Sequence, residues 1–325
     1  MEQERRNIRV GLAVIAGALF LNLAGGMTDA AVALFSHPRV AEFLVYMETG
    51  RVVRLDAPVS EETTQPVQET TLPPQIPVTF DPKDAELVKL SDFTGYGPDI
   101  EKLLTSPLSW DLTQGGPAVL ILHTHATESY AGVPGYRTED RQSNMLRVGQ
   151  EIARVLEENG IEVIHDTTLH DKPSYNGSYN NARKTIAARL EEYPSIRLVL
   201  DIHRDALELT DAVQLSTQAQ VDGQDSAQLM LVMGTDANGL HHPRWQESLA
   251  VGVKLHALLE RKYPGICRAM QLRKERFNQD FSHAAMIVEV GAAGDTLEKA
   301  LVAARAFAES VVALSQGAAT TDSTS

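Results

Sequence analysis

Short apolar runs alternate with helix-patterned segments between Leu87 and Gln316. The runs typical of buried strands lie at 117–122, 162–164, 197–202, 228–233 and 285–290. Apolar residues at helical spacing follow them, around 145–156, 186–190, 245–259 and 297–314, with Gly160, Pro194 or Pro264 after the first three. Strands that alternate with helices predict an α/β fold, a mostly parallel sheet flanked by helices on both faces.

The N-terminal segment has a different pattern. Residues 10–28 carry no charge and follow Arg5, Arg6 and Arg9. As a helix rising 1.5 Å per residue, this stretch reaches roughly 28 Å, about the thickness of the hydrocarbon core of a bilayer. Basic residues before a span favour a cytoplasmic N-terminus, so we expect a single-pass membrane anchor with the rest of the chain outside the cytoplasm. A signal peptide cleaved near 23–26 is the alternative.

The remaining segments differ in composition. We expect a cytoplasmic tip and transmembrane anchor at 1–28, a membrane-proximal segment at 29–55 and a Pro/Thr-rich linker at 56–86, followed by the α/β domain at 87–316 and a disordered tail at 317–325. A net charge of -14 argues against nucleic acid as a partner, because binding a polyanion needs a basic surface. The single cysteine, Cys267, cannot form an internal disulfide, and we expect a buried thiol.

Ligand-type side chains follow the apolar runs. The first run leads into His123, His125 and Glu128, the run at 197–202 leads into His203 and Arg204, and the last run carries Glu289. Ligands of open α/β sheets bind outside the carboxyl ends of strands, so these groups can converge at one edge. Two histidines and an acid suit zinc, which leaves a position for an activated water. Glu289, on an apolar strand, is the candidate proton shuttle, and Arg204 is a candidate for stabilising an oxyanion or a substrate carboxylate.

Each of these features also has a purely structural interpretation. A His-x-His pair is common on strands, and Glu289 could form a buried ion pair with Arg204 or Arg276. The segment 201–205 could be a polar knot that orients the backbone. The combination is more specific than any one part, since ligand-type residues follow three separate strands.

Several long segments resemble the stage II sporulation protein P family. They are LILHTHATESY, IEVIHDTTLHDKPSYNGSYNNAR, DIHRDA, KYPGICRAM, FNQDFSHAAMIVEVG and DTLEKA, in that order over roughly 115–310. The resemblance implies a zinc-dependent N-acetylmuramoyl-L-alanine amidase fold for 87–316, with activity on peptidoglycan and possible endopeptidase activity. It further implies sporulation proteins D and M of stage II as partners during engulfment, and the peptidoglycan stem peptide and glycan as substrate.

The resemblance also assigns roles to residues. Its HTH motif corresponds to His123 and His125, its DIHRD motif to His203, and its catalytic acid to Glu289. The acidic zinc ligand is expected to be Glu128, with Glu139 or Asp140 as alternatives at the start of the next helix.

The chain departs from the family pattern at two positions. Phe277 replaces an expected tyrosine and Ala284 an expected arginine, which affects expected substrate contacts rather than the metal set. For residues 278–280 we expect a contact with the stem peptide.

Two other functions compete with the membrane-anchored hydrolase. One is a non-catalytic scaffold that binds the cell wall through an amidase-like fold. The other is an unrelated metallohydrolase acting on another amide outside the cytoplasm. Neither a scaffold nor a simple binder needs an open metal site or Glu289, and this favours the hydrolase.

Overall fold

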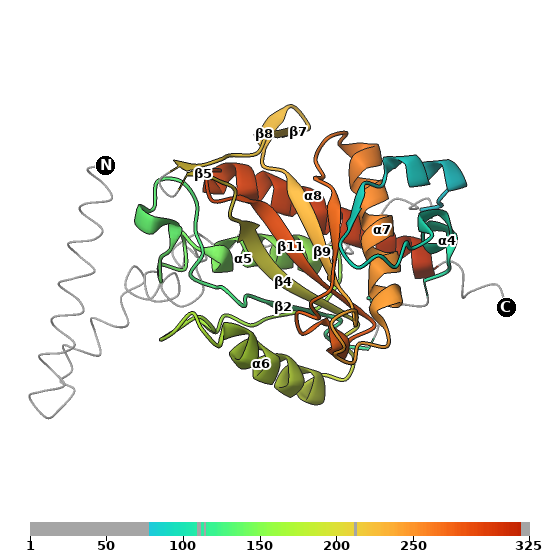
Figure 1. Ribbon diagram of the computed structural model, residues 1–325, viewed down its shortest axis with the longest axis horizontal. Coiled ribbons are helices and arrows are strands. Elements are labelled where there is room, and N and C mark those ends of the chain that lie inside the picture. The colour runs from blue at the N-terminus through green and yellow to red at the C-terminus, as the bar shows by residue number, and fades with distance from the viewer. Residues whose placement is uncertain (1–77, 109–111, 114, 211–212, 320–325) are drawn as a thin grey trace, which may run out of the picture. The chain divides into compact units, whose positions relative to one another are not determined.

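A seven-stranded sheet forms the centre of the protein, with strand order β1-β10-β9-β11-β4-β2-β3 (Figure 1). The computed structural model describes residues 78–108, 112–113, 115–210 and 213–319, all within one compact unit, Pro73–Ser325. The strands are β1 (Leu90–Asp92), β2 (Val119–Leu122), β3 (Val163–His165), β4 (Leu198–Asp205), β9 (Leu229–Gly234), β10 (Met270–Arg273) and β11 (Ala284–Ala292). The hairpins β5 (Glu208–Thr210) with β6 (Val213–Gln214), and β7 (Ala219–Val221) with β8 (Gln224–Ser226), lie outside it.

All pairings in the sheet are parallel except the one between β9 and β11. The expectation of a mostly parallel sheet is therefore confirmed. The reversal divides the sheet into two blocks. Strands β11, β4, β2 and β3 run one way, and β1, β10 and β9 run the other.

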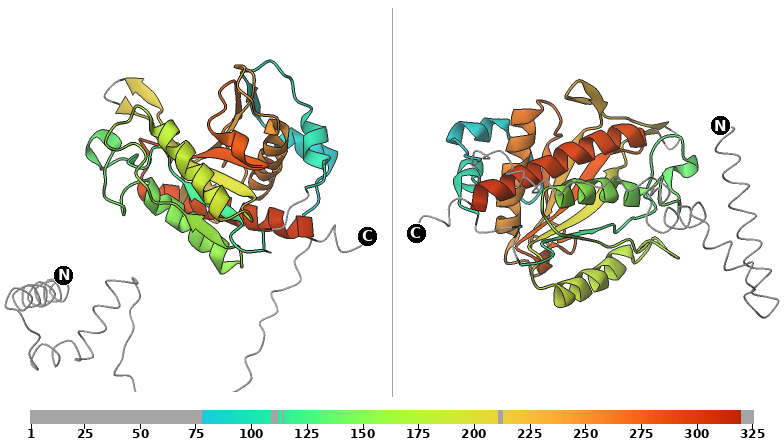
Figure 2. Two further views of the ribbon diagram at one scale, coloured as in Figure 1. Left: turned by 90° about the horizontal axis from the view of Figure 1, so that it is seen from below. Right: turned by 180° about the vertical axis from the view of Figure 1, so that it is seen from behind.

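Helices cover both faces of the sheet, as expected (Figure 2). On one face lie α5 (Met145–Glu158), α7 (Trp245–Lys262) and α8 (Leu297–Ala319), while α6 (Ser178–Glu192) covers the other. Short elements complete the domain: α4 (Ile100–Thr105) and the 3-10 helices η1 (Pro82–Leu87), η2 (Pro134–Tyr136) and η3 (Gln279–Phe281). Asn144 caps α5 by accepting from the Leu146 backbone N–H, which fixes where that helix begins.

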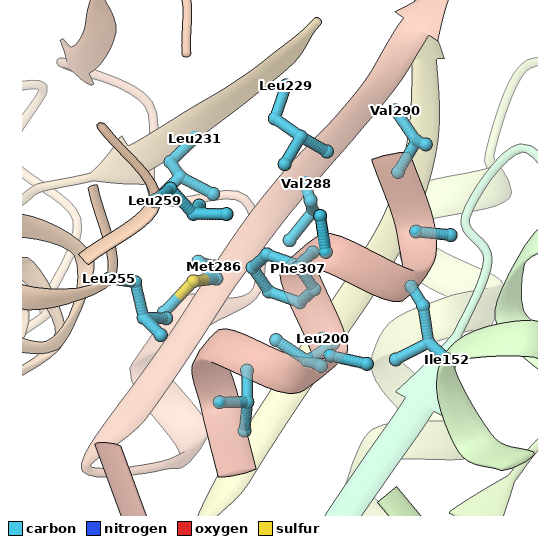
Figure 3. Close-up of a cluster of buried hydrophobic side chains, with 14 of the residues drawn as sticks. Ile152, Leu200, Leu229, Leu231, Leu255, Leu259, Met286, Val288, Val290 and Phe307 are labelled. Atoms are coloured by element: carbon cyan, nitrogen blue, oxygen red, sulfur yellow. The ribbon is translucent and has the colours of Figure 1, made fainter. Parts of the chain in front are cut away.

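Strands β4 and β11 have two different faces. Toward α5 and α8 they direct Leu200, Met286 and Val288, which lie around Phe307 of α8 (Figure 3). Ile202 of β4 belongs to the same buried cluster. Each such buried side chain contributes about 1.5–3 kcal/mol. Because side chains alternate along a strand, the residues between them point to the α6 face. Those residues include the predicted site groups.

The predicted anchor, membrane-proximal segment and most of the linker lie outside the described residues. None of the described helices is both long and apolar enough to cross a bilayer. Cys267 is buried, as expected.

Candidate metal-binding and catalytic site

The structure brings His125, Glu128 and His203 together on the α6 side of the sheet. The rings of His125 and His203 meet edge to face, with centroids 5.3 Å apart. Glu128 Oε2 lies 3.4 Å from His203 Nδ1. All three side chains are buried. The loop after β2 supplies the first two, and β4 supplies the third.

Two carboxylates, those of Asp201 and Glu128, lie close to the His203 ring. Its Nε2 lies 2.9 Å from Asp201 Oδ1, although the two groups do not have the alignment of a hydrogen bond. Burial alone would lower the pKa of His203, but Asp201 and Glu128 outweigh it and raise this pKa well above its usual value. Burial also lowers the pKa of His125 to about 4, helped by His203, so His125 is neutral at pH 7. A neutral imidazole is the form that binds a metal.

Glu289 lies next to His203 across the parallel pairing of β11 and β4. Burial raises the pKa of Glu289 to about 8, because a charged carboxylate loses its hydration there. Its Oε2 has no hydrogen-bond partner. Among the described residues it forms neither of the ion pairs weighed above, since Arg204 and Arg276 make other contacts.

Buried atoms without partners gather in this cluster. Four of them are His125 Nδ1, Glu128 Oε2, His203 Nε2 and Glu289 Oε2. A buried polar atom left without a partner costs about 1–3 kcal/mol, so a ligand that satisfies several of them is favoured. In the part of the chain that the structure describes, no three His, Cys, Asp or Glu side chains are already arranged to hold a metal ion. Two imidazoles and a carboxylate are nevertheless donors that suit zinc, and they would have to move closer together to bind it.

His123 lies apart from the other predicted ligands. Its Nδ1 is 3.1 Å from the Ile202 carbonyl oxygen and its Nε2 is 2.9 Å from His165 Nε2, so both ring nitrogens have neighbours. The ring faces α5, where a Cβ on Gly149 would come within 2.6 Å of it. Burial lowers the pKa of His123 to about 3. These contacts describe a buried structural histidine behind the site.

Arg204 holds the loop that carries Glu128. Its Nε donates to the Ser129 carbonyl oxygen at 3.0 Å, and its NH2 donates to the Tyr136 carbonyl oxygen at 3.1 Å. Its NH1 lies 3.8 Å from Glu128 Oε1. With these donors occupied and 7% of the side chain exposed, Arg204 positions Glu128 rather than facing an oxyanion.

The two alternative acidic ligands lie elsewhere. Glu139 forms an exposed ion pair with Lys172, with Oε1 2.7 Å from Nζ. Asp140 accepts hydrogen bonds from the Ser143 hydroxyl and the Gln142 backbone N–H. Glu128 is the candidate that lies beside His203.

Two tyrosines that the sequence did not single out line the site. The Tyr175 ring stacks on His125 at 4.3 Å, nearly parallel, and Tyr179 meets the same imidazole edge to face at 5.6 Å. Burial raises the pKa of Tyr179 well above its usual value, so its hydroxyl stays protonated. Asp201 was also overlooked as a site residue; it accepts from the Thr124 backbone and hydroxyl, and these contacts fix its position.

Residues 278–280, for which a contact with the stem peptide was expected, make contacts within the protein. Gln279 accepts from the Gly234 N–H and donates to the Val232 carbonyl oxygen. Asp280 pairs with Arg183 at 2.8 Å. Phe277 packs on the apolar side chains of β9 and β11, which explains why this position needs no hydroxyl.

Comparisons with solved structures find partial similarity to amidases. AmiC2, an N-acetylmuramoyl-L-alanine amidase of Nostoc punctiforme, is 14% identical with a TM-score of 0.38, over 64% of this chain and 98% of that one. The N-acetylmuramoyl-L-alanine amidase of Clostridium difficile 630 is 15% identical with a TM-score of 0.37, over 65% and 100%. With such low TM-scores, neither similarity defines the function of this chain.

Sequence comparisons are more specific. Stage II sporulation protein P of Bacillus subtilis strain 168 is 28% identical over 207 residues, which cover 59% of this chain and 49% of that protein. The chain thus matches about half the length of this relative. The family model described as stage II sporulation protein P matches residues 54–312, most of the chain. The chain therefore belongs to the stage II sporulation protein P family.

Proposed function

We propose that the protein is a zinc-dependent peptidoglycan hydrolase, an N-acetylmuramoyl-L-alanine amidase that remodels the cell wall during engulfment in sporulation. Membership of the family supports the cell-wall role. One observation carries the chemistry: buried, unpartnered atoms of His125, Glu128 and Glu289 gather beside His203 on one side of the sheet. Such a set is costly when empty and suits a cation and a reacting water.

His125, Glu128 and His203 would hold the zinc ion. His203 would bind through Nδ1, which faces Glu128, while Asp201, 2.9 Å from Nε2, orients the ring. Carboxylates commonly orient metal-binding histidines in this way. When bound, zinc supplies a water that ionises near neutral pH. His203 loses its proton when it becomes a ligand, so binding is expected to release protons.

Glu289 handles the proton in this proposal. Its carboxylate takes the proton of the attacking water and delivers it to the leaving nitrogen of the amide. Its place beside His203 keeps it close to the reacting atoms, and its Oε2 is buried. Arg204 keeps Glu128 in place through the backbone of its loop, and Tyr175 backs the His125 ring.

Three further parts of the proposal concern the setting of the enzyme. The uncharged segment 10–28 anchors it in the cell membrane with the domain outside the cytoplasm. Stage II sporulation proteins D and M are its proposed partners, by family resemblance. The same resemblance allows endopeptidase cleavage in addition to amidase cleavage.

The test uses the full-length chain in detergent with dye-labelled peptidoglycan. We expect dye release that a chelator abolishes and zinc restores, about one zinc per chain by elemental analysis, and loss of that zinc in His203→Ala. Mass spectrometry should find products with free muramic acid ends and intact stem peptides. Zinc binding without chelator-sensitive cleavage, alone or with the partner proteins, would instead indicate a wall-binding scaffold. Products that lack free muramic acid ends would indicate a hydrolase of another amide.

A further inference from the structure

The proposed amide hydrolysis needs a hydrogen-bond donor for the carbonyl oxygen of the substrate. Negative charge builds up on this oxygen when water attacks, and a donor placed beside it makes a large contribution to catalysis. Arg204, the donor expected from the sequence, gives its Nε and NH2 to two backbone oxygens. Arg137 directs its NH2 at Glu128 and its NH1 at Asp171. Another side chain is therefore needed for this role.

Helix α6 points Tyr179 at the candidate site. Tyr179, Ala182 and Ile186 recur at helical spacing and so lie on one face of the helix. Ala182 and Ile186 belong to a buried cluster with apolar residues of β2 and β4, so this is the face that packs on the sheet. Tyr179 comes one turn nearer to the start of α6, where it meets His125 in the loop after β2.

The Tyr179 ring contacts His125 and Phe277. It meets the imidazole of His125 edge to face, with centroids 5.6 Å apart, and the Phe277 ring lies 6.0 Å away. Asn278 Nδ2 donates to the Tyr179 carbonyl oxygen at 2.8 Å, which fixes the backbone at the start of α6. The ring therefore has a fixed position beside a candidate zinc ligand.

The Tyr179 hydroxyl is available to a substrate. No group of the described residues forms a hydrogen bond with it, and the residue is only half-buried. Besides burial, the charges of three carboxylates raise the pKa of Tyr179, namely those of Asp201, Glu289 and Glu128. The hydroxyl therefore lies near the proposed proton carrier, Glu289, and near the proposed zinc ligand Glu128.

We propose that Tyr179 is a further catalytic residue, whose hydroxyl donates a hydrogen bond to the carbonyl oxygen of the scissile amide. The inference rests on the proposed function and adds a residue to it. The hydrogen bond strengthens as water adds to the carbonyl carbon and the oxygen gains negative charge, and it weakens when the carbonyl re-forms and the nitrogen leaves. The phenol keeps its proton throughout, so Glu289 alone carries the proton from the water to the nitrogen. With the metal in place the nearby carboxylates are compensated, and the site then favours a negative oxygen.

The test compares Tyr179→Phe with the parent in the zinc-loaded, full-length chain. Steady-state cleavage of a soluble disaccharide-peptide gives kcat and KM, elemental analysis gives the zinc content, and thermal unfolding gives the melting temperature. A phosphinate analogue of the scissile amide, which carries a charged oxygen on a tetrahedral centre, probes binding of the transition state. Tyr193→Phe is the matched control, because it removes a phenol hydroxyl from the opposite end of α6, beside Glu192.

We expect Tyr179→Phe to lower kcat by about 10²-fold and to leave KM within about threefold of the parent, with about one zinc per chain and an unchanged melting temperature. The Kd of the phosphinate should rise by the same factor by which kcat/KM falls. Tyr193→Phe should match the parent in every measurement.

Three results would overturn the inference. A parent-like kcat in Tyr179→Phe would do so and leave the amidase intact. Loss of zinc or a lower melting temperature would give Tyr179 a structural role, as would a fall in kcat with unchanged binding of the phosphinate. A zinc-loaded parent chain that cleaves no amide, alone or with the partner proteins, would refute the proposed function and this inference with it.

Discussion

The two faces of β4 and β11 carry different kinds of side chain, apolar on one and polar on the other. Toward α8, Leu200, Met286 and Val288 pack on Phe307 with no polar atom among them (Figure 3). Toward α6, the alternate positions carry Asp201, His203 and Glu289. The strand positions toward α8 carry apolar side chains that need no hydrogen-bond partner, whereas those toward α6 carry buried atoms without partners.

This difference indicates how the domain tolerates a costly site. Each unpartnered buried atom costs about 1–3 kcal/mol. The apolar face offsets that cost, since each of its buried side chains contributes about 1.5–3 kcal/mol. Substitutions on the α6 face should therefore change activity more than stability, and substitutions on the other face should do the opposite.

The largest effect is expected for Glu289→Gln. The change keeps the shape of the side chain but removes the proton carrier, so kcat should fall by about 10²–10⁴-fold, the usual contribution of acid-base catalysis. Zinc content should stay the same. The measurement is dye release together with elemental analysis.

The thermal stability of Glu289→Gln completes that comparison. An amide needs no ionised form in this buried position, so the melting temperature should be unchanged or higher. A variant that loses activity because it unfolds would instead place Glu289 with the structural residues.

Phe307→Ala is the corresponding change on the apolar face. Phe307 is fully buried at the centre of the packing in Figure 3, and its truncation leaves a cavity. The free energy of unfolding should fall by about 3–5 kcal/mol. Denaturant unfolding measures this loss. At a temperature where the variant is folded, kcat should stay within about threefold of the parent, and a loss like that of Glu289→Gln would contradict the separation of the two faces.

A buried histidine on α7 should make the apolar face sensitive to acid. Burial lowers the pKa of His256 to about 4, from about 6.5 when unfolded. Between these values the unfolded chain binds more protons, so stability falls as the pH is lowered from about 6.5 to 4. The loss amounts to at most about 3 kcal/mol by linkage. His256→Gln should make this part of the stability curve less steep, because other buried histidines such as His123 and His125 also contribute to it. Denaturant unfolding at several pH values measures the slope, and an unchanged slope would contradict the assignment.

The smallest effect concerns the boundary between the faces, at Gly149. A Cβ here would lie 2.6 Å from the His123 ring and 2.8 Å from His165 Nε2. Overpacking costs about 1–3 kcal/mol, and the better helix propensity of alanine returns about 1 kcal/mol. We expect Gly149→Ala to lose about 1 kcal/mol in the free energy of unfolding. In the double variant Gly149→Ala with His165→Ala, the loss of unfolding free energy should be smaller than the sum of the two single losses, because the alanine gains space when the imidazole is removed. If the two losses simply add, the His165 ring is not what disfavours a side chain at position 149.

Much of the fold could be predicted because it depends on continuous apolar runs. Strands β2, β4 and β11 and the helices after them follow such runs. Strands β1 and β10 were missed because they are short and partly polar, and their pairing is long-range. The direction of β9 is likewise invisible in its sequence, since a buried strand is apolar on both faces whichever way it runs.

The site was predictable in its residues but less so in their placement. His123 and His125 are two apart and would share a face on a strand, yet β2 ends at Leu122, so alternation no longer applies and the rings diverge. Arg204 could be recognised as important, but the backbone oxygens it contacts depend on how the 128–137 loop folds. Tyr175 and Tyr179 carried no signal, because an aromatic near a helix start is ordinary.

Because β9 runs antiparallel to β11, the carboxyl ends of the strands lie at two opposite edges of the sheet. The carboxyl ends of β2, β4 and β11 lie beside His203, whereas those of β1, β10 and β9 lie at the opposite end of the sheet. At that far rim Tyr96 stacks on Trp245 at 5.2 Å and donates to Asp236. Loops at the edge near Tyr96 can therefore change in length or sequence without disturbing the candidate site at the other edge. A fluorophore attached near Tyr96 would leave His125, Glu128 and His203 in place.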